Sequence, residues 1–178
     1  MKMIISLTFL GILMLAFAEV NSETCTLMEA AKNFDENKYF NIPLAYATHS
    51  KNREPETNVC REYSTARGPD GKTVTTFTIK DKTLTSAVKC TNTPIPGSNG
   101  QFSSDCELSA GNRITVTTSI LATDNEKYAI LQRCPTSGPG NILVLQTNKN
   151  GVEQGVQNYF NQKGWDISTW LSRTTVGC

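Results

Sequence analysis

Metal-binding and histidine-dependent chemistry have little to build on in this sequence. It contains one histidine, His49, and no two of its six cysteines are spaced as a C-x-x-C pair. Local spacing therefore provides neither a structural zinc site nor a haem-attachment motif, so we expect no metal and no cofactor. No Gly-x-Ser-x-Gly turn occurs that could present a nucleophilic serine. We expect no catalytic residues, and a binding protein rather than an enzyme.

An excess of charge of one sign is also missing. The 17 basic residues nearly balance the 16 acidic ones, and the net charge is +1. Nucleic-acid binding requires clustered Lys and Arg, whereas here the basic residues are scattered among the acids, so we expect no nucleic-acid partner. No Asn-x-Ser/Thr sequon occurs, and no apolar run after the first residues is long enough to cross a bilayer. We therefore expect a soluble monomer with no membrane partner.

The longest apolar run lies at the N-terminus, where Lys2 precedes the stretch 3–17. This stretch is too short for a membrane span and is typical of a secretory signal peptide. Val20 and Ser22 provide the small residues for cleavage after Ser22, although Ala18 would also allow an earlier cut. The sequence therefore predicts a signal peptide over 1–22 and one secreted, extracellular domain over 23–178.

All the cysteines follow that cleavage point. An even number in an exported chain predicts three disulfides. Six cysteines allow 15 different connectivities, and sequence alone does not choose among them. The six are Cys25, Cys60, Cys90, Cys106, Cys134 and Cys178.

Threonine and other β-branched residues alternate with apolar ones through much of the chain, for example in 73–79 and 114–120. This alternation, bounded by Gly, Pro, Asn and Asp, indicates half-buried strands. The turn signals divide the chain into strands, and their number and spacing indicate an all-β antiparallel fold, either a barrel or a sandwich. We expect eight strands near 42–50, 60–67, 72–80, 83–91, 101–108, 113–122, 127–134 and 142–147.

Two short segments show helical rather than strand periodicity. The first predicts a short N-terminal helix through Leu27, Ala30, Ala31 and Phe34. The second predicts a C-terminal helix that ends at Gly164 and packs against the outside of the sheet. Its apolar face consists of Val152, Val156, Tyr159 and Phe160.

This layout, together with the segment from Asn33-Phe34 to Lys38-Tyr39-Phe40, resembles the triatomine salivary lipocalins of the triabin and pallidipin group. The resemblance implies an eight-stranded antiparallel up-and-down barrel around one small ligand. The lipocalin Gly-x-Trp signature is replaced here by Asn41-Ile42-Pro43-Leu44, and we expect Leu44 with Tyr46 to fill the barrel floor. Related salivary lipocalins hold haem through a barrel histidine, but the segment 74–80 has none, which argues against haem here.

The same resemblance implies the disulfide pairing. Cys25 would join Cys134, Cys60 would join Cys178, and Cys90 would join Cys106. If Cys60 and Cys134 then point outward, strand alternation turns Arg61 and Tyr63 inward on one strand, and Ala129, Leu131 and Arg133 inward on another.

An arginine inside an apolar cavity is costly to bury without an anion, so Arg61 or Arg133 would suit a ligand carboxylate. The alternative is that either is a solvated rim residue or pairs with Glu62 or Asp105. Gln146 could add a hydrogen bond from the last strand, although no disulfide sets its orientation. The candidate ligand-binding residues are Arg61, Tyr63, Leu131, Arg133 and Gln146.

The resemblance implies a small amphiphilic carboxylate ligand, thromboxane A2 or a related prostanoid, and inhibition of host platelet aggregation by sequestration. Arg61 would pair with the carboxylate while Tyr63 and Leu131 pack the tail. Other classes remain open: an amine binder using Glu54, Glu56 and Asp124, or a nucleotide binder using Lys51, Arg53 and Lys72. An inhibitor of a clotting protease or platelet collagen receptor would act through its outer surface instead.

Overall fold

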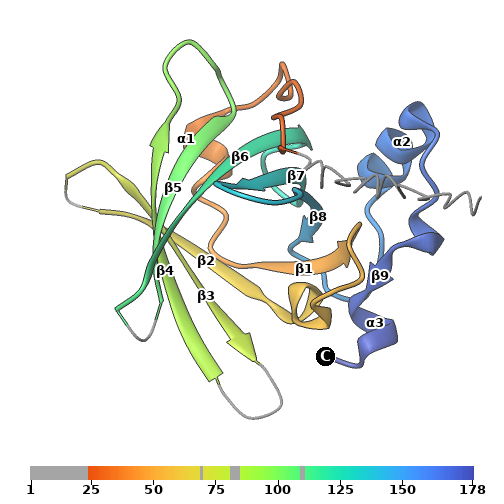
Figure 1. The fold of residues 1–178 in the computed structure, drawn as a ribbon. Helices are drawn as coiled ribbons and strands as arrows, with labels where there is room; N and C mark the ends of the chain where they lie inside the picture. The colour runs from red at the N-terminus through yellow and green to blue at the C-terminus, as the bar shows by residue number, and fades with distance from the viewer. Residues whose placement is uncertain (1–23, 69, 81–84, 109–110) are drawn as a thin grey trace, which may run out of the picture.

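The computed structural model describes residues 24–68, 70–80, 85–108 and 111–178, so the predicted signal peptide and the start of the predicted fourth strand lie outside the described residues. Eight antiparallel strands follow one another around a barrel, and β1 closes it by pairing with both β8 and β2 (Figure 1). All eight predicted strands are present, and the barrel prediction is confirmed. They are β1 Ala45–Ser50, β2 Glu62–Arg67, β3 Thr73–Lys80, β4 Thr85–Pro94, β5 Gln101–Leu108, β6 Arg113–Thr123, β7 Tyr128–Pro135 and β8 Asn141–Gln146.

The ladder between β1 and β2 is the shortest in the barrel wall. Its register contains two residue pairs, Ala45 with Tyr63 and Tyr46 with Glu62. By contrast, β3 and β4 are paired through eight positions. A short ninth strand, β9 (Leu171–Ser172), was not predicted. It pairs with His49 and Ser50 of β1, on the edge of β1 that does not pair with β8.

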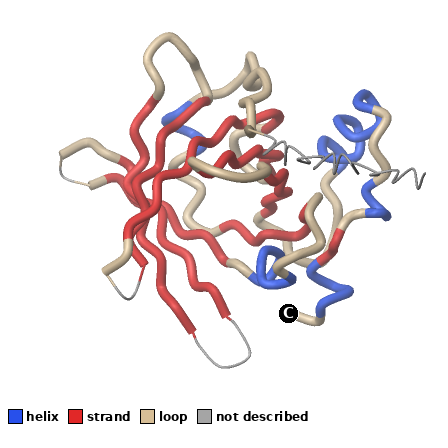
Figure 2. The backbone as a smooth tube through the Cα atoms, in the orientation of Figure 1, coloured by secondary structure: helices blue, strands red, loops and turns tan. Residues whose placement is uncertain are grey.

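Helices lie outside the barrel or at its end (Figure 2). The predicted C-terminal helix is confirmed as α2 (Gln154–Lys163), which ends at Gly164 in the left-handed conformation with φ 64°. Its buried Val156 and Phe160 pack on Ile130 and Val144, which point outward from β7 and β8. The remaining short elements are η1 (Glu56–Cys60), η2 (Ile167–Thr169) and α3 (Arg173–Val176).

The short N-terminal helix exists, but it lies later than the periodicity predicted. It is α1 (Glu36–Tyr39), capped by the side chain of Asp35, which accepts hydrogen bonds from the backbone N–H groups of Asn37 and Lys38. Residues 27–34 contain no helix. The helical prediction for that segment is therefore wrong, because its backbone groups bond to the barrel instead.

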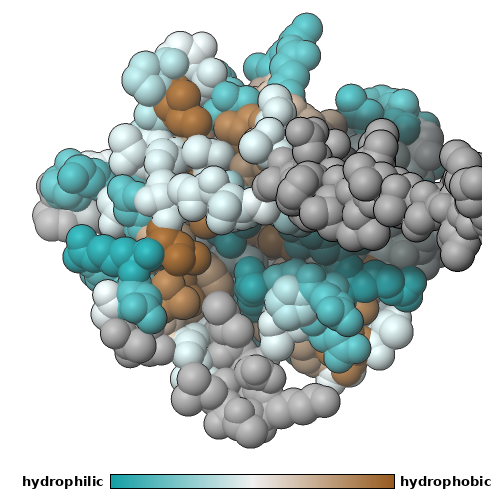
Figure 3. Space-filling model, in the orientation of Figure 1, coloured by the Kyte–Doolittle hydropathy of each residue, from teal (hydrophilic) through white to brown (hydrophobic). Residues whose placement is uncertain are grey.

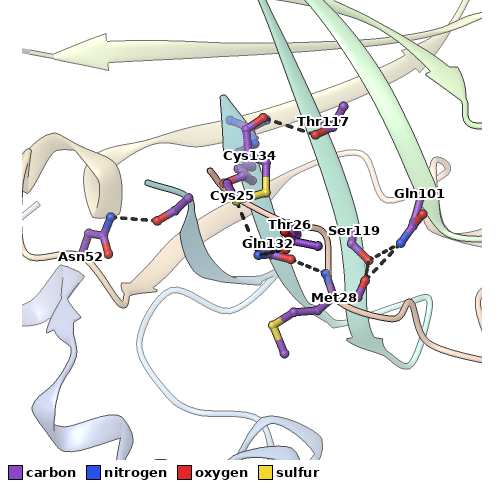
Figure 4. The surroundings of a disulfide bond; sticks show 11 residues. Cys25, Thr26, Met28, Asn52, Gln101, Thr117, Ser119, Gln132 and Cys134 are labelled. Carbon is purple, nitrogen blue, oxygen red and sulfur yellow. Dashed lines mark hydrogen bonds between the residues drawn. A yellow bond between two sulfur atoms is a disulfide. The ribbon is translucent and has the colours of Figure 1, made fainter. Parts of the chain in front are cut away.

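We call residues 24–35 the N-terminal strap, since they run along the outside of β5, β6 and β7 (Figure 4). Met28 donates its backbone N–H to Gln132 Oε1 at 2.7 Å, and its carbonyl accepts hydrogen bonds from Ser119 Oγ at 2.7 Å and Gln101 Nε2 at 3.1 Å. Further along, Ala31 donates its N–H to the carbonyl of Ile120. These bonds satisfy backbone groups that a helix would otherwise have paired internally.

The strap ends by delivering aromatic side chains to one end of the barrel. Phe34 and Phe40 both stack edge-on against Phe102 of β5, with ring centroids 5.6 and 5.1 Å apart. Gly100 makes this approach possible, because a Cβ there would lie 3.1 Å from Ala30 Cβ and 3.3 Å from Phe34 Cγ. The three phenylalanines pack together across this end of the barrel, which we call the floor.

The floor is therefore built differently from the prediction based on Leu44 and Tyr46. Leu44 is 37% exposed. Tyr46 pairs with Glu62 and Gln146 in the register and lies on the outer face, with its ring 5.3 Å from the Arg173 guanidinium. The alternation that turns Ala45 and Ala47 inward leaves Tyr46 outside.

The three disulfides are those that the family resemblance implied: Cys25–Cys134, Cys60–Cys178 and Cys90–Cys106. The first ties the strap to β7, the second ties the residue Cys178 after α3 to the end of η1, and the third crosses between the paired strands β4 and β5. Among the described residues, no helix has the length and apolar character to cross a membrane. Figure 3 shows a mainly polar visible face with small apolar areas between polar groups.

A candidate ligand cavity in the barrel

A cavity occupies the barrel between the floor and the middle of the strands. It contains about 690 Å³ of space not filled by atoms, including the part that reaches solvent. The lining residues come from α1, the segment after it, all eight barrel strands and the turn before β7. Those that form the apolar part are Phe40, Ile42, Ala45, Phe102, Ile120, Ala129, Leu131 and Leu145.

One wall of the cavity is polar and internally hydrogen-bonded. Thr65 and Thr75 Oγ1 atoms lie 3.0 Å apart, Asn92 donates from Nδ2 to Thr75 Oγ1 at 2.9 Å, and Ser104 Oγ donates to Asn92 Oδ1 at 2.8 Å. The inward positions of β2, β3, β4 and β5 meet here because the strand registers align them. This polar ladder was not predicted, although alternation from Tyr63 would have turned Thr65 inward.

Arg133 is the main charged group in the cavity. It projects from β7 across the lumen, and its Cζ atom lies 5.3 Å from the centroid of the Tyr63 ring and 5.5 Å from that of Phe77, on the opposite wall. Its Nε atom is buried without a hydrogen-bond partner among the described residues. Stacking on aromatic rings offsets part of the cost of burying this charge, but it leaves the donors of the guanidinium available.

Two tyrosines accompany this arginine. The hydroxyl group of Tyr63 is buried and has no hydrogen-bond partner in the described structure. Burial raises the pKa of Tyr39 to about 12, although the positive charge of Arg133 opposes that increase. Tyr39 is therefore a neutral O–H donor at physiological pH, close to the same guanidinium. Arg133, Tyr63 and Tyr39 together form a cluster of donors facing the cavity, which we call the donor cluster.

Arg61 lies behind this cluster rather than in the cavity lining. Its Cζ atom is 5.4 Å from the Phe77 centroid, and its Nε atom is also buried without a partner among the described residues. The same aromatic ring thus carries two guanidinium groups. Arg61 adds positive potential at this end of the cavity, whereas Arg133 is the arginine that reaches the cavity itself.

The predicted acidic partners of the two arginines are occupied elsewhere. Glu62 pairs with Arg173 at 3.0 Å, and Asp105 accepts a hydrogen bond from Thr115 Oγ1 at 2.9 Å. In the described part of the chain, neither Arg61 nor Arg133 is within ion-pair distance of a carboxylate. Among the described residues that line the cavity, none is Asp or Glu. The cavity is therefore electropositive.

Some of the ligand-binding residues predicted from the sequence line the cavity, and others do not. Tyr63, Leu131 and Arg133 line the cavity, with Ala129 on the same face of β7 as the alternation predicted. Gln146 lies outside it: its Nε2 donates to Thr48 Oγ1 and the Gly151 carbonyl, both at 2.8 Å, and its Oε1 accepts the Glu153 N–H at 2.7 Å. Each polar atom of this amide is used to anchor the loop before α2. Gln146 is therefore not retained as a ligand contact.

His49 also lies away from the cavity lining, on β1 beside Thr48, with Nδ1 3.2 Å from Thr48 Oγ1. Burial lowers its pKa from the ordinary value of 6.5. The unfolded chain therefore binds a proton at His49 more readily than the folded protein does. The free energy of unfolding is highest above the ordinary histidine pKa, where the side chain is neutral in both states, and it falls as pH drops toward the lower pKa of the folded protein. We expect the wild-type protein to lose stability between pH 8 and 5.5, and His49→Gln to lose less. Urea unfolding across that range tests this, and parallel curves for the two proteins would contradict it.

Among the described residues, no group of three or more His, Cys, Asp or Glu side chains is arranged to hold a metal ion. The site is thus a partly apolar chamber with a polar ladder on one wall and the donor cluster at one end. Such an arrangement can hold an elongated molecule with an anionic group. It provides hydrogen-bond donors and positive charge for that group, and apolar contacts for the rest.

Comparisons with known proteins agree with this architecture. Triplatin from Triatoma infestans is 54% identical over 182 residues, a match that covers 100% of this chain and 97% of that protein. The structure of the LTBP1 complex with leukotriene C4 matches with a TM-score of 0.60 and 26% identity, over 76% of this chain and 84% of that one. The tryptamine complex of the amine binding protein of Rhodnius prolixus, at 19% identity, matches in fold with a TM-score of 0.71, over 86% of this chain and 88% of that one.

The Triabin family model matches residues 19–159, which include the strap, α1 and all eight barrel strands. This match and the identity to triplatin along the whole chain agree with the closed barrel, the three disulfides and the interior cavity. The chain belongs to the Triabin family.

Proposed function

We propose that this protein is a secreted salivary binder of carboxylate lipids of the eicosanoid class, with thromboxane A2 as its principal ligand, and that it opposes host platelet aggregation by sequestering that lipid. The observation that carries the proposal is the donor cluster of Arg133, Tyr63 and Tyr39, which faces the cavity with no carboxylate in contact among the described residues. The mechanism is stoichiometric binding, without turnover.

The donor cluster supports an anionic head group. A guanidinium with free donors and two neutral phenols offers charge-assisted hydrogen bonds, which are about twice as strong as neutral ones. Burying Arg133 without an anion carries a cost that a bound carboxylate would remove. Arg61, whose guanidinium also lies over the Phe77 ring, strengthens the positive potential.

The remaining cavity supports a long apolar chain with internal oxygen atoms. Leu131, Leu145 and Phe102 provide apolar contact, while the polar ladder can offer or accept hydrogen bonds along the chain. LTBP1, which matches in structure at 26% identity, was solved with leukotriene C4, another eicosanoid. The amine binding protein of Rhodnius prolixus was solved with tryptamine, but a protonated amine in this cavity would meet an arginine and, among the described lining residues, no acidic side chain.

Export of the protein is part of the same proposal. The apolar run 3–17 after Lys2 is typical of a signal peptide, and three disulfides are expected in an oxidising compartment.

Calorimetric titration of the oxidised protein with a stable thromboxane mimetic tests the proposal, with serotonin and ADP as controls. We expect one mimetic to bind per protein molecule, and neither control to bind at comparable concentrations. Binding of serotonin or ADP in preference to the mimetic would overturn the assignment. If none of the three compounds binds, the cavity is not the active part, and a protein partner of the outer surface, such as a platelet receptor or a clotting protease, should be tested.

A further inference from the structure

A second cationic side chain lines the cavity at the end opposite Arg133. Lys127 directly precedes β7, and its carbonyl accepts the Thr147 N–H at 2.8 Å, so the antiparallel pairing with the chain after β8 continues to this residue. Counting along the strand in steps of two, Lys127 shares its face with Ala129, Leu131 and Arg133. The inward-facing residues of β7 and of the position just before it therefore begin with one cation, Lys127, and end with another, Arg133.

The stretch of strand between the two cations is apolar on its inner face. Ala129 and Leu131 are both buried there. Lys127 and Arg133 are six positions apart along the chain, which corresponds to about 20 Å between their Cα atoms in an extended strand. Of the cavity-lining residues in the described structure, Lys127 alone is exposed, so the cavity reaches solvent beside it, at the floor end of β7.

The ammonium group of Lys127 has no acidic partner in the described part of the chain. The nearest carboxylate in sequence, Asp124, accepts hydrogen bonds from the backbone N–H groups of Glu126, Lys127 and Tyr128 at 3.1, 2.8 and 3.1 Å. Asp124 therefore shapes the turn rather than forming an ion pair with the lysine. The described residues that line the cavity include two charged side chains, Lys127 and Arg133, and both are positive.

We infer that the cavity prefers lipids with an anionic group at both ends, the first held by Arg133 and the second by Lys127. This inference rests on the proposed function, because it assumes that the cavity holds an anionic lipid. It narrows the ligand class to chains that carry a second carboxylate or another anionic substituent far from the first. A chain with one carboxylate would use the donor cluster and leave Lys127 in water.

The test compares hexadecanoic acid with hexadecanedioic acid, which differ only in the second carboxylate. We expect the wild-type protein to bind the diacid about fivefold more tightly than the monoacid, as for one partly exposed ion pair. Lys127→Gln should abolish that preference while leaving affinity for the monoacid within about twofold. Lys127→Glu should reverse it, and added salt should weaken it in the wild type.

Lys89→Gln provides the matched control, since Lys89 is an exposed lysine of β4 that is absent from the cavity lining. This variant should keep the full preference for the diacid. Equal wild-type affinity for the two acids, or a preference that survives Lys127→Gln, would overturn the inference and leave the proposed function standing if the thromboxane mimetic binds. Failure of both acids and the mimetic to bind would overturn both.

Discussion

Replacing Arg133 by methionine is expected to weaken binding of the thromboxane mimetic by about 10- to 100-fold. Loss of a hydrogen bond to a charged group typically costs about 1.5–3 kcal/mol, and this arginine is the one that reaches the cavity. Methionine has a flexible apolar side chain that can keep the contacts with Tyr63 and Phe77. Calorimetric titration of both proteins with the same mimetic gives the ratio of the two affinities.

The stability of the same variant separates binding from folding. The ligand-free Arg133→Met protein loses its stacking on two rings but also loses a buried guanidinium with an unpartnered Nε. These effects oppose each other, so its free energy of unfolding should stay within about 1 kcal/mol of the wild-type value. Arg67→Met is the matched control, because Arg67 is exposed on β2 and outside the cavity lining. Unchanged affinity in Arg133→Met, or a fall as large in the control, would refute the assignment.

Removing the Cys25–Cys134 disulfide by a double serine substitution is expected to lower the free energy of unfolding by about 4–5 kcal/mol. The two cysteines are 109 residues apart, and a cross-link that closes so long a loop constrains the unfolded chain strongly. The bond also holds the strap beside Gln132 and Ser119 (Figure 4). Denaturant unfolding of the oxidised proteins measures the loss.

The Cys90–Cys106 bond is the natural comparison. It closes a loop of 16 residues between strands that are already paired, so its removal should cost less, about 3 kcal/mol. The strap variant should also bind the mimetic more weakly, because Phe34 and Tyr39 reach the floor and the cavity through the strap. Equal losses of stability in the two variants, with ligand affinity unchanged in both, would show that the strap does not organise the cavity.

Sequence alone predicted the strands well because each is bounded by turn residues and alternates in polarity. Residues 101–108 were predicted to form a strand, and β5 has those bounds. The same alternation turned Tyr63, Leu131 and Arg133 toward the barrel interior. The prediction from helical periodicity failed for residues 27–34, where Ala30 and Phe34 recur at helical spacing but pack on Gly100 as part of the strap. Apolar spacing reports which side chains are covered, not which backbone groups are paired.

The candidate site was harder to predict because its members meet only after the barrel closes. Arg133 lies across the lumen from Tyr63 and Phe77, and no local pattern reports the opposite wall of a barrel. Tyr39 comes from the helix that follows the strap. Gln146 looked available because its polarity is visible in the sequence, whereas its three hydrogen-bond partners are not. Burial of a polar residue is a tertiary property.

The barrel closes between β1 and β2 through only two residue pairs, and we call this short ladder the seam. Arg173 lies across that seam: it donates to the carbonyls of Val59 and Arg61, pairs with Glu62, and stacks on Tyr46 of β1. The Cys60–Cys178 bond fastens the same place. The last residues of the chain therefore act as a clasp, and the shape of the ligand chamber depends on a segment that never touches its contents.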